Sequence, residues 1–348
     1  MSHGYQAVTW TKFKKRYDLF LIAAVVGFIL LYAITTLVTS PHANPVQVLI
    51  RAFGIAAIVL LHVILAIGPL ARLNAAYLPF LYNRRHLGVM MAVLATIHGG
   101  ISAFWYHALG TRNPVVSVFL TDWGSSPGAF PFQAFGALAL MVIFVMAATS
   151  HDFWLTNLTA PVWKSLHMLV YVAYALLVVH IGFGVLQAET SPVYLGLLSL
   201  GAIGLIMLHL TAASGERDAD TPVSASPQDD GFVRVATVAE MPVDEAISAC
   251  LSGERVAVLR YIEDGVEKVS AMSGVCQHQN GPLSEGRFVH GCLTCPWHGY
   301  QYKTDTGASP APFTEKIPTF NVRVHDGEVF VHPTPNPAGT RVEPVVLT

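Results

Sequence analysis

Charged side chains are scarce in this chain. Asp, Glu, Lys and Arg make up 12% of its 348 residues and hydrophobic residues 53%, whereas a typical soluble protein is roughly 25% charged. This composition excludes a disordered chain, a coiled coil and an ordinary soluble globule. Acidic residues are rarest in residues 1–213, which hold four of them against ten Lys or Arg. Residues 214–348 hold eighteen against ten, so a net charge of −2 averages regions of +6 and −8.

Other common signatures are missing too. There is no G-x-G-x-x-G dinucleotide fingerprint and no acid, base or nucleophile set typical of a hydrolase or transferase. The polar, basic start and an uncleavable first apolar run predict no signal peptide. The four cysteines all lie in the second region, and the spacing of two of them favours a metal site over two disulfides. They are Cys250, Cys276, Cys292 and Cys295.

Long apolar runs dominate the first region. A membrane span needs roughly 20 apolar residues, and the alternative, a large buried helical core, is disfavoured because the runs follow one another with few charges inside them. We therefore predict a six-helix transmembrane bundle, with spans at 19–38, 46–70, 87–109, 132–149, 162–186 and 193–213.

Basic residues gather on one side of these spans. They precede the first span, lie between the second and third, open the fifth and follow the sixth, whereas the other side has only Arg51 and Arg112. By the positive-inside rule, we predict a multi-pass inner-membrane protein whose segment 1–18 and C-terminal region are cytoplasmic.

The ionisable residues inside the spans are nearly all histidines. Such residues are costly in a membrane and usually functional. A lone histidine can be structural, but several with almost no Asp or Glu favour axial heme ligation over a proton relay. They are His62, His98, His167, His180 and His209.

The segments Arg84-Arg85-His86-Leu87-Gly88 and Ala95-Thr96-Ile97-His98 resemble span three of the ferric-reductase-like transmembrane domain. The segment from Trp163 to Tyr171, followed by His180, resembles its span five. The resemblance covers about residues 46–213 and is greatest to the heme-binding membrane subunit of periplasmic methionine sulfoxide reductase systems. It implies electron transfer through one or two b-type hemes, with His98 and His180 binding the outer heme and His167 the inner one.

The resemblance leaves the second ligand of an inner heme open. NADPH oxidases carry another histidine fourteen residues before the position of His98, where this chain has Arg84. His62 is the candidate replacement, and a hydrogen-bonded structural histidine is the alternative. Thirteen residues separate His167 from His180, about 140° around a helix, so a bulge or kink near Gly182 or Gly184 would be needed to align them.

The second region reads as a small all-β domain. We expect a polar linker at 214–230, the domain at 231–335 and a tail at 336–348. His325-Asp326-Gly327-Glu328 predicts a tight hairpin turn. The expected strands are 232–238, 255–261, 266–272, 287–294, 319–324 and 329–332.

Two short motifs carry the chemistry of this domain. Cys276-Gln-His278 is followed, after sixteen residues, by Cys295-Pro-Trp-His298. Two cysteines and two histidines also suit zinc, but the pattern resembles the Rieske motif, which implies a [2Fe–2S] cluster with two thiolates on one iron and two imidazoles on the other. The remaining cysteines, Cys250 and Cys292, are predicted to be structural.

The resemblance also bounds the reduction potential of the cluster. High-potential Rieske proteins have a disulfide between the cluster loops, at positions matching Gly281 and Trp297 here. They also have a serine where this chain has Tyr300, whereas Tyr302 matches their tyrosine. With fewer hydrogen bonds to sulfur, we expect the lower half of the roughly −150 to +300 mV range.

Together the regions predict an electron-transfer protein. A soluble flavoprotein or ferredoxin would reduce the cluster, and electrons would pass through heme to a quinone, metal ion, oxygen or periplasmic partner. The reverse is the first alternative, with quinol as donor and a cytoplasmic oxygenase or reductase as acceptor, docked on a domain with a net charge of −4. A non-catalytic redox-sensing subunit is the second.

Overall fold

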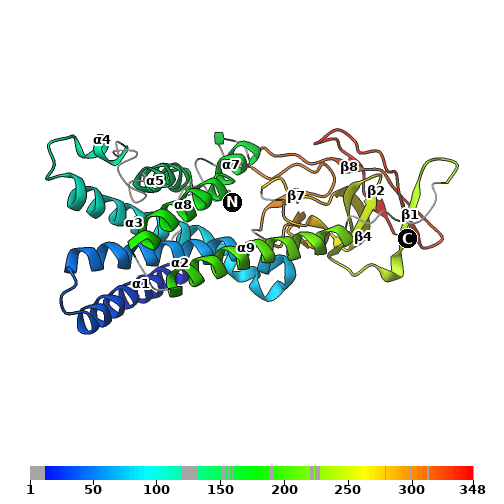
Figure 1. Cartoon of the computed structure of the whole chain (residues 1–348). Coiled ribbons are helices and arrows are strands. Elements are labelled where there is room, and N and C mark those ends of the chain that lie inside the picture. Colours follow the sequence, from blue (N-terminus) through cyan, green and yellow to red (C-terminus); the bar gives the residue numbers. More distant parts are fainter. Residues whose placement is uncertain are drawn as a thin grey trace. The chain divides into compact units, whose positions relative to one another are not determined.

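The structure is a computed structural model (Figure 1). Contacts divide the chain into two compact units, one of residues 6–152 and 165–210, the other of 1–5, 153–164 and 211–348. The structure describes residues 12–119, 132–150, 154, 157–158, 160–188, 192–219, 223, 228–278, 280–297, 299–311 and 313–347.

Each predicted apolar run is helical. Among the described residues, five helices are long and apolar enough to cross a membrane, and a sixth, α5, is apolar but has only 17 residues. The short helices η1 (Ala75–Tyr77) and α4 (Pro114–Phe119) lie between the long ones. The predicted spans correspond to α1 (Lys12–Thr39), α2 (Pro45–Leu73), α3 (Leu78–His107), α5 (Phe132–Ala148), the two helices α7 (Ala160–His167) and α8 (Val170–Ala188), and α9 (Pro192–Ala219).

Alanines lie among the most buried residues of the helical unit, and many large apolar residues are exposed on its outside. Ala52 on α2, Ala139 on α5 and Ala173 on α8 have no exposed surface, whereas Phe20 on α1 and Leu200 on α9 are 75% and 70% exposed. Small residues let helices approach closely where lipid gives no hydrophobic driving force between them. The pattern supports the membrane prediction.

The fifth predicted span is broken directly after His167. The amides of Leu169 and Tyr171 donate to the carbonyls three residues earlier, a tight turn that ends α7 and starts α8. The kink was expected near Gly182 or Gly184, but α8 runs through both. Gly184 instead makes room for a neighbour, because a Cβ there would lie 2.6 Å from the Phe132 ring.

The second region is a two-sheet β-sandwich. One sheet has the order β1-β10-β9, the other β11-β4-β3-β2-β5-β6-β7, with β8 also paired to β4. The short helices η3 (Val238–Glu240) and η4 (Leu283–Glu285) lie in connections. The strands are β1 (Val233–Thr237), β2 (Glu245–Leu251), β3 (Glu254–Glu263), β4 (Val266–Ser273), β5 (Arg287–Val289), β6 (Cys292–Thr294), β7 (Gln301–Lys303), β8 (Thr319–Phe320), β9 (Val322–His325), β10 (Glu328–Val331) and β11 (Val345–Val346).

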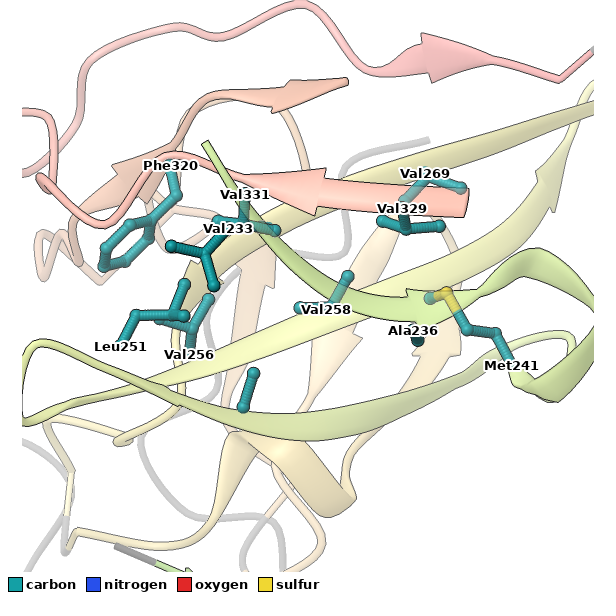
Figure 2. Packing of buried hydrophobic residues seen from close by; sticks show 12 residues of the cluster. Val233, Ala236, Met241, Leu251, Val256, Val258, Val269, Phe320, Val329 and Val331 are labelled. Atoms are coloured by element: carbon teal, nitrogen blue, oxygen red, sulfur yellow. The ribbon is translucent and has the colours of Figure 1, made fainter. Parts of the chain in front are cut away.

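The core of this domain lies between its two sheets. Val233 on β1 and Val331 on β10 face Val258 on β3 and Val269 on β4, with Phe320 closing one end (Figure 2). Alternation along each strand sends these residues to one face. The predicted hairpin is present: His325 pairs with Glu328, and the two turn residues between them have positive φ angles.

Several sequence expectations differ from the structure: the expected strand 287–294 is divided into β5 and β6, and β7 was not expected. Glu245–Leu251 forms β2, paired along its whole length with β3, although its Ala and Ser residues have weak β propensity. The expected tail contributes β11, which pairs with β4 because Val345 and Val346 extend that sheet edge. The expected linker begins as helix, since α9 continues to Ala219, and Val223 donates its amide to the Cys250 carbonyl.

Candidate functional site

The two cysteine motifs lie on loops with the same backbone pattern. The Cys276 carbonyl accepts a hydrogen bond from the amide of Asn280, and its amide donates to the Gly281 carbonyl. The Cys295 carbonyl likewise accepts from Gly299, and its amide donates to the Tyr300 carbonyl. Each loop is thus closed by its own residues four and five positions further on.

The loops contact each other through a glycine. A Cβ on Gly281 would lie 2.5 Å from Sγ of Cys295 and 3.3 Å from the Trp297 ring, so only glycine fits. Gly281 and Trp297 are the positions that the resemblance matched to the disulfide of high-potential relatives, and the structure places them side by side. The thiols of Cys276 and Cys295 are buried.

The predicted ligand set is partly described. Cys276, His278 and Cys295 lie on these loops and are all buried, whereas His298 lies outside the described residues. Among the part of the chain that the structure describes, no group of three or more His, Cys, Asp or Glu side chains is arranged to hold a metal ion. The buried thiols and the glycine-lined approach of one loop to Sγ of Cys295 fit a cluster held between two loops.

Tyr302 lies under the first loop. Its hydroxyl is 3.6 Å from Sγ of Cys276 and accepts the amide of Gln277 at 3.0 Å. Burial and the neighbouring Cys276 raise the pKa of this hydroxyl. The hydroxyl therefore stays protonated and lies within hydrogen-bond distance of a cysteine sulfur.

Tyr300 has a different role from the serine it replaces. Its hydroxyl donates to the buried Glu315 carboxylate, which also accepts the amide of Thr314 at 3.1 Å. Burial and then this bond to Glu315 raise the pKa of Tyr300. Its ring stacks on His278 with centroids 5.3 Å apart. Glu315 was not singled out from the sequence, where an isolated Thr-Glu-Lys gives no signal.

In the helical unit, His98 on α3 and His180 on α8 come together. Their ring centroids lie 6.2 Å apart with the planes at 82°. Nδ1 of His98 lies 2.8 Å from the Ile50 carbonyl, and Nδ1 of His180 lies 2.8 Å from the Phe132 carbonyl. A carbonyl only accepts, so both Nδ1 atoms carry the proton and both Nε2 atoms keep the lone pair that binds metals.

The surroundings of these two histidines repeat along the chain. The accepting carbonyl lies 48 residues before each histidine, and a glycine lies four residues after that carbonyl. A Cβ on Gly54 would lie 3.0 Å from the His98 ring, and one on Gly136 would lie 2.7 Å from that of His180. Ala-Phe-Gly occurs at 52–54 and again at 134–136, a repeat that the sequence analysis missed and that marks both sites.

The other two predicted heme ligands lie elsewhere. His62 donates from Nδ1 to the Ile58 carbonyl and accepts the Tyr174 hydroxyl on Nε2 at 3.0 Å, so both of its ring nitrogens are engaged. These are the contacts that a hydrogen-bonded structural histidine would make, and heme ligation by His62 stays a prediction. His167 ends α7, with Nε2 3.5 Å from the Ser150 hydroxyl.

Comparison with known proteins supports the family resemblance of both regions. Residues 53–178 match the family model "Ferric reductase like transmembrane component", and residues 231–321 match "Rieske [2Fe-2S] domain". The protein-methionine-sulfoxide reductase heme-binding subunit MsrQ of Caulobacter vibrioides is 32% identical over 44% of this chain and 69% of its own length. The anthranilate 1,2-dioxygenase ferredoxin subunit of Burkholderia cepacia is 31% identical over 28% of this chain and 88% of its own.

Two further matches each cover less than a third of this chain. The chain spans 19% of the length of a cholesterol 7-desaturase from Ciona intestinalis. A solved structure, the complex of reduced oxygenase and oxidized ferredoxin in carbazole 1,9a-dioxygenase, covers 31% of this chain and 98% of its own, with 25% identity and a TM-score of 0.28.

Fold, sites and relatives define a membrane protein with an electron-transfer role, built from a helical bundle and a [2Fe–2S]-type β domain. More particularly, the chain belongs to the ferric reductase-like transmembrane family and carries a Rieske domain after its last membrane helix.

Proposed function

We propose that this protein passes single electrons between a cytoplasmic Rieske cluster and a b-type heme inside the membrane. The heme would be held by His98 and His180, and the cluster by Cys276, His278, Cys295 and His298. The observation that carries the proposal is the His98–His180 pair, because it brings two imidazole rings within 6.2 Å of each other inside an apolar bundle.

The spacing of the two rings supports this role. An imidazole nitrogen binds a metal at about 2 Å, so two imidazoles that held one iron between them would have centroids about 6 Å apart. The observed separation is 6.2 Å. The carbonyls of Ile50 and Phe132 orient the rings and raise the basicity of Nε2, while Gly54 and Gly136 leave room for them. When bound, the heme supplies a reversible one-electron couple.

The β domain supports the cytoplasmic end of the path. Its loops hold two buried thiols, and Tyr302 directs a hydroxyl at one of them. Glu315 holds the Tyr300 hydroxyl, so the bond that a serine would give the cluster is not made there. We therefore propose a potential in the lower half of the Rieske range, matched to a soluble ferredoxin or flavoprotein donor.

The basic residues gathered on one side of the spans support our proposal that this is an inner-membrane protein with this domain and both ends of the chain in the cytoplasm. The electrons would then leave toward a quinone, a metal ion or a periplasmic partner. The likeness to a dioxygenase ferredoxin subunit favours a second candidate, in which quinol feeds electrons through the cluster to a cytoplasmic oxygenase. His167, at the break between α7 and α8, is proposed as the ligand of an inner heme if a second one binds.

The deciding experiment is performed on detergent-purified full-length protein. We expect one [2Fe–2S] cluster and one heme per chain if His98 and His180 form the only heme site, and two hemes if His167 binds another. Zinc without heme would contradict both candidates. Stopped-flow reduction by a reduced ferredoxin, compared with reduction by a quinol, sets the direction. Reduction by quinol alone would exclude the outward path.

A further inference from the structure

A tryptophan outside the β domain's own sequence covers the predicted cluster site. Residues 153–164 belong to the same compact unit as residues 211–348. Within this unit, Trp163 is only 5% exposed, and Leu158 and Phe313 pack against it. Its indole stacks on the imidazole of His278, with centroids 5.8 Å apart and planes at 21°.

The contact is part of an aromatic cluster around His278. Tyr300 stacks on His278 at 5.3 Å and 10°, and Phe313 packs on Tyr300 at 4.8 Å. His278 itself is 5% exposed. Because this imidazole is covered by residues of its own chain, a soluble partner has no direct access to it.

The position of Trp163 along the chain connects this contact to the membrane helices. Trp163 lies on α7 (Ala160–His167), the helix that leads into the membrane helix α8. Trp163 and His167 are four residues apart, so their side chains share one face of α7. A neutral aromatic ring over a buried imidazole also keeps water away, which lowers the reorganisation needed when the charge of a neighbouring redox group changes.

We propose that Trp163 is a positioning residue for internal electron transfer: it docks α7 on His278, so that the cluster exchanges electrons with the membrane domain through this ligand. The inference rests on the proposed function. In each event one electron leaves a reduced cluster, which returns to its oxidised form, and one ferric heme becomes ferrous. The soluble one-electron donor proposed above restores the cluster and must dock elsewhere on the domain.

The test compares Trp163→Ala and Trp163→Phe with Trp154→Ala in cofactor-loaded, full-length protein. Trp154 is a control from the same segment that is 39% exposed. Deazaflavin flash photolysis delivers one electron, and absorbance follows its passage from cluster to heme. Hydrogen exchange of peptides covering 275–281 reports, independently of electron transfer, whether the first cluster loop is still covered.

We expect Trp163→Ala to slow cluster-to-heme transfer by about tenfold or more and to speed exchange in 275–281, with cluster and heme contents unchanged. Trp163→Phe should keep transfer within about threefold of wild type, and Trp154→Ala should change neither readout. Wild-type transfer in Trp163→Ala would overturn the proposal, whether or not exchange rises. If the wild-type heme accepts no electron from the cluster, the proposed function fails, whereas faster exchange in Trp163→Ala would still support docking on His278.

Discussion

The two candidate redox sites are built in opposite ways. In the helical unit, each histidine is oriented by a carbonyl 48 residues away on another helix, and a glycine on that helix makes room for the ring. In the β domain, each cysteine loop is closed by hydrogen bonds within five residues. The first site therefore depends on helix packing, and the second mainly on local sequence. Mutations should separate the two sites cleanly.

The largest effect is expected from removing a heme ligand. His98→Ala or His180→Ala takes away one of two axial donors, so b-heme absorbance should be lost while the Rieske EPR signal stays. His62→Ala is the matched control, because both of its ring nitrogens are engaged by protein groups, and it should keep full heme content. Loss of the cluster signal in His180→Ala would show that the sites are not independent. Undiminished electron transfer in both ligand variants would instead favour the redox-sensing alternative.

In the β domain, Gly281→Ala should disrupt the cluster site while leaving the heme site intact. The new Cβ would lie 2.5 Å from Sγ of Cys295, inside the space that the cluster loops share, and overpacking of this kind costs about 1–3 kcal/mol. We expect most of the [2Fe–2S] absorbance to disappear with heme retained. A variant with full cluster content would contradict the tight contact between the loops.

Gly136→Ala should have a smaller effect on the membrane site. The added methyl group would lie 2.7 Å from the His180 ring, against 3.0 Å between a Cβ on Gly54 and His98. Heme content or affinity should therefore fall in Gly136→Ala, and less in Gly54→Ala. Gly182→Ala is the control on α8, because a Cβ there meets nothing within 4 Å. Equal heme loss in all three variants would indicate general helix destabilisation.

The smallest effect is a shift of the cluster potential. Tyr302→Phe removes the hydroxyl that lies 3.6 Å from Sγ of Cys276. If one hydrogen bond contributes about 0.5–1.5 kcal/mol, the one-electron potential should fall by about 20–65 mV. Redox titration followed by EPR measures this change. Because the pKa of Tyr302 is raised, the shift should be the same across neutral and mildly alkaline pH. An unchanged potential would show that the Tyr302 hydroxyl does not influence the cluster.

The difference between a locally closed site and a site made by helix packing also explains which features the sequence could predict. The cysteine motifs were readable because their loops are local, and the spans because apolar length is a local property. The carbonyls of Ile50 and Phe132 that orient the histidines could not be predicted from the sequence, because a backbone group leaves no signature in side-chain type. The break after His167 lies in His-Met-Leu-Val, which has no Gly or Pro, so the kink was expected at glycines that in fact serve packing or face open space. Strands β2 and β11 were missed because pairing within the sheet outweighs their weak local signal.

The repeated offsets in the helical unit have a consequence for symmetry. Shifting the chain by 82 residues carries Ile50, Gly54 and His98 onto Phe132, Gly136 and His180. The same carbonyl acceptor, the same glycine and the same histidine therefore recur on two helix pairs. A planar group bound between the two imidazoles would meet an oriented ring from each pair. If His98 and His180 both held one heme, its metal would have no position left for a small ligand, and such a site would suit electron transfer rather than oxygen binding.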